Sequence, residues 1–190
     1  MLKKILRFGK DRDGLAAIEF AFIAPVMVTL FFGTMELAQA LSCRTDVGSV
    51  ASTAGDLVAQ ESTITTADLS NVYNAATAIL YPYYPNFSTV KPTIRITSII
   101  DTGNTGSGKI AWTCTQAGSG TLTPSSRSTG QTVTLPQPIM TSGNSIIMAE
   151  VSYGYSSPIS SMIVGTPNMT NVFYTRPRQV AQIPGPGTCP

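Results

Sequence analysis

The sequence predicts an α+β protein, with a long N-terminal helix that continues into an extracytoplasmic domain, a second helix, and an antiparallel sheet of about four or five strands. Two observations lead to this class. An apolar run at residues 15–41 continues at helical spacing beyond its end, and the period changes to two after residue 93. A chain of 190 residues has room for one ordinary domain plus an appendage. We therefore divide it into a basic segment at 1–14, an apolar helix at 15–41 and an α+β domain at 42–190.

The apolar run is long enough to cross a membrane. Its densest part, "FAFIAPVMVTLFFGTM" at residues 20–35, holds no charge, and the flanks supply the rest of the roughly 20 residues that a bilayer requires. Five basic residues against two acidic ones give residues 1–14 a net charge of +3, and only Arg44 follows soon after the run. The positive-inside tendency therefore predicts a single-pass protein with its N-terminus in the cytoplasm and residues 42–190 outside.

A cleaved secretory signal peptide is the competing interpretation of the same segment. A basic head followed by an apolar core is also the layout of such a peptide. The run is longer than a usual signal core, however, and it contains Glu19 and Glu36. The nearest small-residue cleavage site is only "ALS" at 40–42. These features favour a membrane-spanning helix.

Helical spacing continues beyond the span and returns after a break. The first helix is expected to continue along Val47, Val50, Ala51, Ala54, Leu57 and Val58. A second helix is predicted from Thr65, an N-cap candidate with Asp68 three residues later. Its apolar face comprises Leu69, Val72, Tyr73, Ala76, Ile79 and Leu80. Pro82 and Pro85 cannot continue a helix and so predict its end.

Alternating residues predict the strands of the sheet. Three segments alternate clearly, and their inward residues are Ile94 and Ile96; Ile110, Trp112 and Cys114; and Ile147, Ala149, Val151 and Tyr153. A further short strand is expected around residues 172–175. The loop "DTGNTGSG" separates the first two strands, and the segment at 117–131 is rich in Ser, Thr and Gly, which predicts a mobile loop.

Composition excludes several classes of function. Beyond residue 14 the chain holds seven basic and eight acidic residues without a basic cluster, so it offers no nucleic-acid footprint. It lacks histidine, the commonest general base and metal ligand, and its three cysteines do not have metal-ligand spacing. We therefore expect no cofactor and no metal. Among three possible disulfides we favour Cys114 with Cys189, while Cys43, where the helix leaves the membrane, stays reduced or pairs between subunits.

Glu19 lies inside the apolar run, where a carboxylate is costly and by default marks a functional site. It follows Gly14 by five residues and precedes Phe20, in "RDGLAAIEFAFIAPVMVTLFFGTMEL", with Pro25 further on. This segment resembles prepilin-peptidase substrates, and most closely the TadE-like minor pilins of tight-adherence (Flp-type) pili. The resemblance is specific over roughly residues 12–41 and loose over the remaining domain.

The resemblance implies a pilin-like protein of the bacterial inner membrane with a periplasmic C-terminal domain. Residues 1–14 would be a prepilin-type leader, cut between Gly14 and Leu15, although Leu15 is an unusual first residue for a mature pilin. The new ammonium of Leu15 would then meet Glu19 of a neighbouring subunit, with Phe20 and Pro25 taking part in recognition and packing. The implied role is initiation or capping of the pilus, without catalytic activity. The resemblance leaves open whether the subunit enters the extracellular fibre, and at which end.

The same resemblance implies the partners, which are the prepilin peptidase, the major pilin, other minor pilins, the inner-membrane platform and membrane lipid. Two alternatives remain open. The chain could be a permanent single-span assembly factor that is not cleaved. "SIIDTG" at 98–103 also resembles the active-site turn of aspartic peptidases, so a dimer using Asp101 would be an enzyme. A hairpin turn explains Asp101 more simply.

Overall fold

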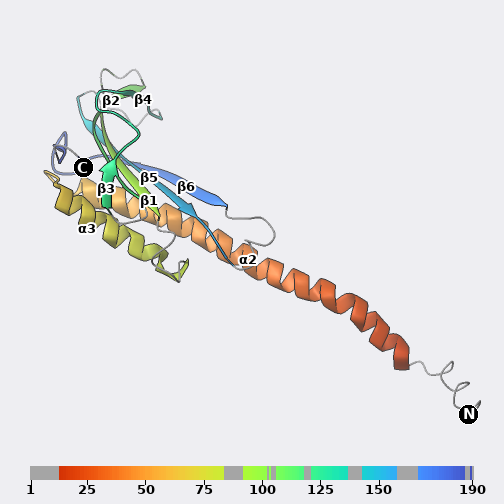
Figure 1. Cartoon of the computed structure of the whole chain (residues 1–190). Helices are drawn as coiled ribbons and strands as arrows, with labels where there is room; N and C mark the ends of the chain where they lie inside the picture. Colours follow the sequence, from red (N-terminus) through yellow and green to blue (C-terminus); the bar gives the residue numbers. More distant parts are fainter. Residues whose placement is uncertain are drawn as a thin grey trace, which may run out of the picture. The chain divides into compact units, whose positions relative to one another are not determined.

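A computed structural model describes residues 13–83, 92–101, 103, 106–117, 121–136, 143–157, 167–186 and 189. The chain divides into two compact units, Met1–Ala40 and Leu41–Pro190. The long helix α2, Asp13–Ala59, contributes to both units (Figure 1). The predicted α+β class is confirmed, because an apolar helix and a second helix accompany an antiparallel sheet.

The C-terminal part of α2 supplies one side of the hydrophobic core. The predicted continuation is confirmed, with Val47, Val50, Ala51, Ala54 and Val58 buried at the expected helical spacing. Leu57 is only half-buried. The helix ends at Ala59, whose carbonyl oxygen accepts a hydrogen bond from the backbone N–H of Arg178 at 2.9 Å. That bond satisfies one of the carbonyl groups that a helix end leaves without an intrahelical partner.

The second helix, α3, spans Thr66–Thr77 and begins at the predicted N-cap. Thr65 and Asp68 form a reciprocal capping box, in which the backbone N–H of Thr65 donates to Asp68 Oδ2 at 2.9 Å. These bonds lower the pKa of the Asp68 carboxyl. The α-helix ends earlier than expected, because the chain tightens into a 3-10 helix, η1, at Ala78–Tyr83. Ile79 and Leu80 therefore lie in η1, and Pro85 lies outside the described residues.

The sheet has six strands in the order β3-β2-β1-β5-β6, with β4 also paired to β2. All described pairings are antiparallel. The strands are β1, Thr93–Asp101; β2, Ser107–Ala117; β3, Thr121–Pro124; β4, Thr132–Thr134; β5, Ser145–Gly154; and β6, Asn168–Thr175. The short strand β3 lies within residues 117–131, so the prediction of a mobile loop there was wrong for these four residues.

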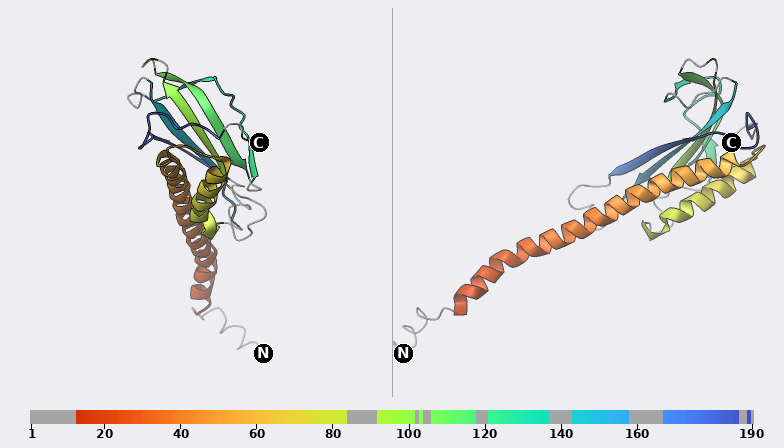
Figure 2. Two further views of the ribbon diagram at one scale, coloured as in Figure 1. Left: turned by 90° about the vertical axis from the view of Figure 1, so that its left-hand side faces the viewer. Right: turned by 180° about the vertical axis from the view of Figure 1, so that it is seen from behind.

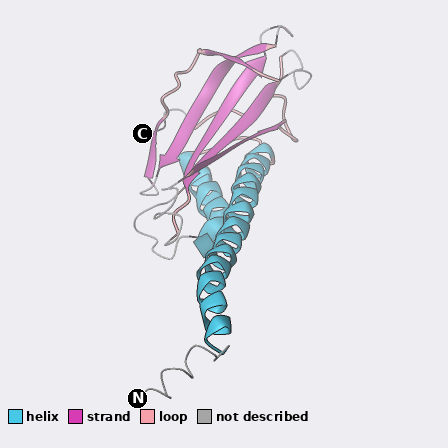
Figure 3. Cartoon of the chain, turned by 90° about the vertical axis from the view of Figure 1, so that its right-hand side faces the viewer, coloured by secondary structure: helices cyan, strands magenta, loops and turns pink. Residues whose placement is uncertain are grey.

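One face of the sheet, the helix face, packs on α2 and α3 (Figures 2 and 3). Its side chains include Ile94, Ile96 and Ala149, all buried. Close approach of α2 depends on Gly55, because a Cβ there would lie 2.9 Å from Cδ1 of Phe173 on β6. On α3, Tyr73 donates from its hydroxyl to the Cys114 carbonyl at 3.0 Å, and burial raises its pKa well above the usual value.

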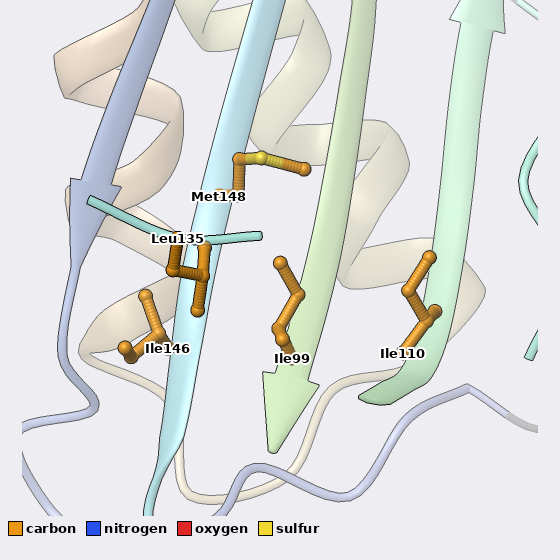
Figure 4. Close-up of a cluster of buried hydrophobic side chains, with 5 residues drawn as sticks. All are labelled: Ile99, Ile110, Leu135, Ile146 and Met148. Carbon is orange, nitrogen blue, oxygen red and sulfur yellow. The ribbon is translucent and has the colours of Figure 1, made fainter. Parts of the chain in front are cut away.

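The other face, the outer face, carries a second apolar cluster, formed by Ile99, Ile110, Leu135, Ile146 and Met148 (Figure 4). The expectation that Ile110 faces the same way as Trp112 was wrong. The register pairs Ser98 with Trp112 and Ile99 with Ile110, so the bulge leaves Ala111 as the extra residue and turns Ile110 to the outer face. Leu135, from the segment 125–136 that we call the outer strap, is 3% exposed over this cluster.

The C-terminal segment packs against β2 of the sheet. Trp112 Nε1 donates to the Ile183 carbonyl at 2.9 Å, and Gly185 lies so close to the Trp112 ring that a Cβ would not fit. A disulfide joins Cys114 to Cys189, which is the pairing favoured above. These contacts attach Ile183, Gly185 and Cys189 to β2.

Reduction of the disulfide should destabilise the domain. The bridged cysteines are 75 residues apart, and the loop-entropy model gives a stabilisation of about 4 kcal/mol for a loop of that size. We expect Cys114→Ser and Cys189→Ser each to lower the free energy of unfolding of the full-length protein in detergent, measured by denaturant titration. Dithiothreitol should lower the stability of the wild type to the same level and leave both variants unchanged. A wild type that is insensitive to reduction would contradict the bridge.

Enlarging Gly55 should separate α2 from β6. Gly55→Val places methyl groups where Phe173 and Ala149 already lie, and overpacking of this kind costs about 1–3 kcal/mol. The melting temperature measures the effect. Gly33→Val is the matched control, because no described atom lies within 4 Å of a Cβ built at Gly33. Equal melting temperatures for the two variants would show that α2 does not pack on β6 as described.

Candidate functional site: the N-terminal part of α2

Residues 14–42 of α2 have no buried side chain among the described residues. The exposed side chains are large and apolar on every side of the helix, and Phe20 and Phe22 are 71% and 76% exposed. The others are Leu15, Ile18, Ile23, Val26, Met27, Val28, Leu30, Phe31, Phe32, Met35, Leu37 and Leu41. A helix that is apolar all round belongs in lipid or inside a protein assembly. By length and composition α2 can cross a membrane, with a mean hydropathy of 2.2 in its most apolar window.

Two threonine hydroxyls within this stretch form hydrogen bonds to the backbone of the same helix. Thr29 Oγ1 donates to the Pro25 carbonyl at 2.8 Å, and Thr34 Oγ1 donates to the Phe31 carbonyl at 2.8 Å. Threonine bonds of this kind hide the hydroxyl from an apolar surrounding. Pro25 lies inside the helix and lacks an N–H, so the carbonyl of Ala21 loses its intrahelical donor. We therefore expect Pro25 to weaken the helix locally, at the carbonyl of Ala21.

Gly14, Leu15 and Glu19 lie in the first two turns of α2, which begins at Asp13. Leu15 and Glu19 are four residues apart, so they lie on the same face of the helix with a rise of about 6 Å between them. Gly14 has no described atom within 4 Å of a Cβ built on it. The peptide bond between Gly14 and Leu15 lies close to the described start of α2.

The uncharged residues 20–35 are bounded by Glu19 and Glu36. At about 1.5 Å per residue the two glutamates are separated by about 26 Å along the axis. This distance is close to the thickness of a hydrocarbon core, which is about 30 Å. Two carboxylates can therefore lie near opposite headgroup layers while the residues between them cross the lipid.

The remaining residues singled out from the sequence lie in the other unit. Cys43 is a buried free thiol, and Cys114 and Cys189 form the disulfide. Asp101 ends β1 and is 3% exposed, and its Oδ1 accepts a hydrogen bond from the N–H of Gly103 at 3.0 Å. This Asx turn is the arrangement expected of a turn carboxylate. Within the described ranges, no group of His, Cys, Asp and Glu could hold a metal ion.

Sequence reasoning missed a charged cluster on the outer face. Arg127 Nη2 lies 2.8 Å from Glu150 Oε1, and Arg95 Nη1 lies 3.5 Å from Glu150 Oε2. β1 and β5 bring Arg95 opposite Glu150, while the outer strap supplies Arg127. A lone Arg or Glu in an alternating strand predicts only an exposed position. The strand register that joins these residues could not be read from the chain.

The model of the TadE-like protein family matches residues 14–56. No curated protein and no solved structure matches the chain. The family match begins at Gly14 and covers all of α2 except its first residue and its last three. It includes Leu15, Glu19, Phe20 and Pro25, the residues on which the resemblance was based. The resemblance to TadE-like proteins is therefore confirmed along α2, and it suggests a Tad pilus-related protein whose N-terminal apolar helix suits a membrane anchor.

Proposed function

We propose that the chain is a minor pilin or pseudopilin that initiates or caps a tight-adherence pilus. The observation that carries this proposal is the exposed, uncharged helix surface at residues 20–35, with Glu19 one turn after Leu15, inside the segment that matches TadE-like proteins. Such a surface needs lipid before assembly and protein neighbours afterwards. The carboxylate of Glu19, at the cytoplasmic end of this surface, provides a charge that can set the register between neighbouring subunits.

In this proposal residues 1–14 are a leader, 15–41 span the bacterial inner membrane and 42–190 form the periplasmic domain. The basic residues before Leu15 keep the leader in the cytoplasm. Prepilin peptidase cuts after Gly14, where the missing Cβ leaves space for a protease to approach the backbone.

After cleavage, the ammonium of Leu15 pairs with Glu19 of an adjacent subunit as the helices pack into the fibre. The partners are the major pilin, other minor pilins and the inner-membrane platform. In a bundle from which water is excluded, the attraction between these charges is stronger than in water, although their desolvation opposes it. We therefore assign the pair to register between subunits rather than to net stability.

Cleavage is tested with Gly14→Leu in cells that assemble the pilus. We expect the membrane-extracted wild type to begin at Leu15, by intact mass and N-terminal sequencing, and the variant to keep its leader. Gly33→Leu is the matched control, because both glycines have open space around a built Cβ. A wild type recovered with Met1 and with full pilus assembly would contradict the proposal and indicate an uncleaved assembly factor.

The role of Glu19 is tested with Glu19→Gln, which keeps the shape and removes the charge. Because the variant loses the charge that fixes the register between subunits, we expect an about tenfold loss of pili per cell. Cleavage after Gly14 should continue, which intact mass checks. Glu36→Gln, the control at the other end of residues 20–35, should retain pili. Wild-type piliation of the Glu19→Gln strain would refute the pairing.

A further inference from the structure

The short helix η1 lies at the end of the domain at which α2 enters it. α3 begins close to the end of α2 and runs beside it in the opposite direction, and η1 continues from α3 (Figures 1, 2 and 3). Cys43, near the entry of α2, and Leu80 of η1 are both fully buried. The chain therefore goes up the domain along α2 and comes back down along α3 and η1.

The lengths of these segments place Tyr81 nearly level with Leu41. From Leu41 to Ala59, α2 rises about 27 Å at 1.5 Å per residue. On the way back, the 12 residues of α3 cover about 18 Å. The first four residues of η1, which end at Tyr81, add about 8 Å, because a 3-10 helix rises about 2.0 Å per residue. η1 thus returns to the level at which the domain begins.

This level is the surface of the membrane in the function proposed above, and the inference rests on that part of the proposal. Residues 15–41 span the bilayer there, so Leu41 is the last residue of the span and marks its periplasmic end. The headgroup layer outside the hydrocarbon core is about 5–8 Å thick. A side chain that is level with Leu41 therefore lies in or against the lipid headgroups.

Two exposed side chains at this level have the chemistry of a lipid–water interface. Tyr81 is 58% exposed, and tyrosine is enriched at membrane surfaces because its ring is apolar and its hydroxyl is polar. Arg44 is exposed and takes part in none of the ion pairs found among the described residues. Side chains of a helix point back toward its N-terminus, which directs Arg44 toward the lipid. A guanidinium binds phosphate through two parallel hydrogen bonds.

We propose that η1 rests on the periplasmic surface of the membrane, with the ring of Tyr81 among the lipid headgroups and the guanidinium of Arg44 bound to a lipid phosphate. The chain then contacts the bilayer at two places, along the apolar part of α2 and at η1. A domain attached by one helix alone is free to tilt and to rotate about that helix. The second contact restricts both motions and sets which face of the domain is presented to neighbouring molecules.

A second copy of this chain fits the surface around η1 less well than lipid does. A parallel copy in the same membrane would present its own Arg44 at nearly the same level, and two cations at short distance repel each other. The phosphates of a bilayer supply the opposite charge at that level. Charge complementarity therefore favours the headgroup layer as the partner.

The test measures how close η1 lies to lipid headgroups. The full-length protein is placed in nanodiscs of phosphatidylcholine and phosphatidylglycerol, part of whose headgroups carry a nitroxide quencher. Ala78→Cys puts a bimane label on η1, and Ala67→Cys, also at an exposed alanine, puts it near the start of α3, about 16 Å away along the axis. We expect the label at residue 78 to lose most of its fluorescence and the label at residue 67 to keep it. The wild type is the labelling control, because its free thiol, Cys43, is buried.

Substitutions of the two side chains test whether they make the contact. In the Ala78→Cys background, Tyr81→Ser and Arg44→Gln should each reduce the quenching. The melting temperature should change little, because both side chains are exposed. Arg178→Gln is the matched control, since Arg178 is also exposed but lies at the far end of α2, where its N–H bonds to the Ala59 carbonyl. This variant should keep the quenching of the wild-type sequence.

A third label separates this inference from the proposed function. Met35→Cys, at an exposed residue of the span, should be quenched whenever α2 crosses the bilayer. Quenching at residue 35 without quenching at residue 78 would overturn the inference and leave the span in place. Equal quenching at residues 78 and 67, or full quenching when Tyr81→Ser and Arg44→Gln are combined, would also overturn it. Loss of quenching at both 35 and 78 would refute the span as well. None of these readouts requires leader cleavage or pilus assembly.

Discussion

The apolar surface of α2 before Leu41 must be covered by something other than the described residues of this chain. Water is a poor solvent for Phe20, Phe22 and their apolar neighbours, and the hydrophobic effect acts on each of them. From Cys43 onward, side chains of the same helix such as Val47 and Val50 are buried in the hydrophobic core of the domain. One continuous helix is therefore matched to two environments. The domain folds on the later part and leaves the earlier part available to lipid or to neighbouring subunits.

The elements that depend on residues close together in the sequence could be predicted from the sequence. Thr65 and Asp68 predicted the start of α3, because a capping box involves residues three positions apart. The buried stripe of α2 after Cys43 followed from helical spacing alone. The glycine and the glutamate at the start of α2 were recognisable for the same reason, since their relation is one of distance along a single helix.

Features that depend on strand register could not be predicted. Ile110 was assigned to the wrong face because one extra residue, Ala111, shifts the alternation of β2. The strand β3 was hidden in a polar segment whose pairing partner decides its conformation. Arg95 and Glu150 are 55 residues apart in sequence and meet only because β1 lies beside β5. The outer-face cluster is thus a property of topology.

The threonine hydroxyls of α2 affect how easily the helix is transferred between lipid and a protein surrounding. Thr29 and Thr34 keep their hydrogen bonds to Pro25 and Phe31 whether hydrocarbon or protein surrounds them. Between Leu15 and Met35 the sequence contains one ionisable side chain, Glu19. In the proposed function, movement of this stretch from bilayer to filament would therefore leave these two hydrogen bonds unaltered. In that proposal, the equilibrium between the two locations depends on close packing of apolar side chains and on the solvation of Glu19 and of the Leu15 ammonium that cleavage creates.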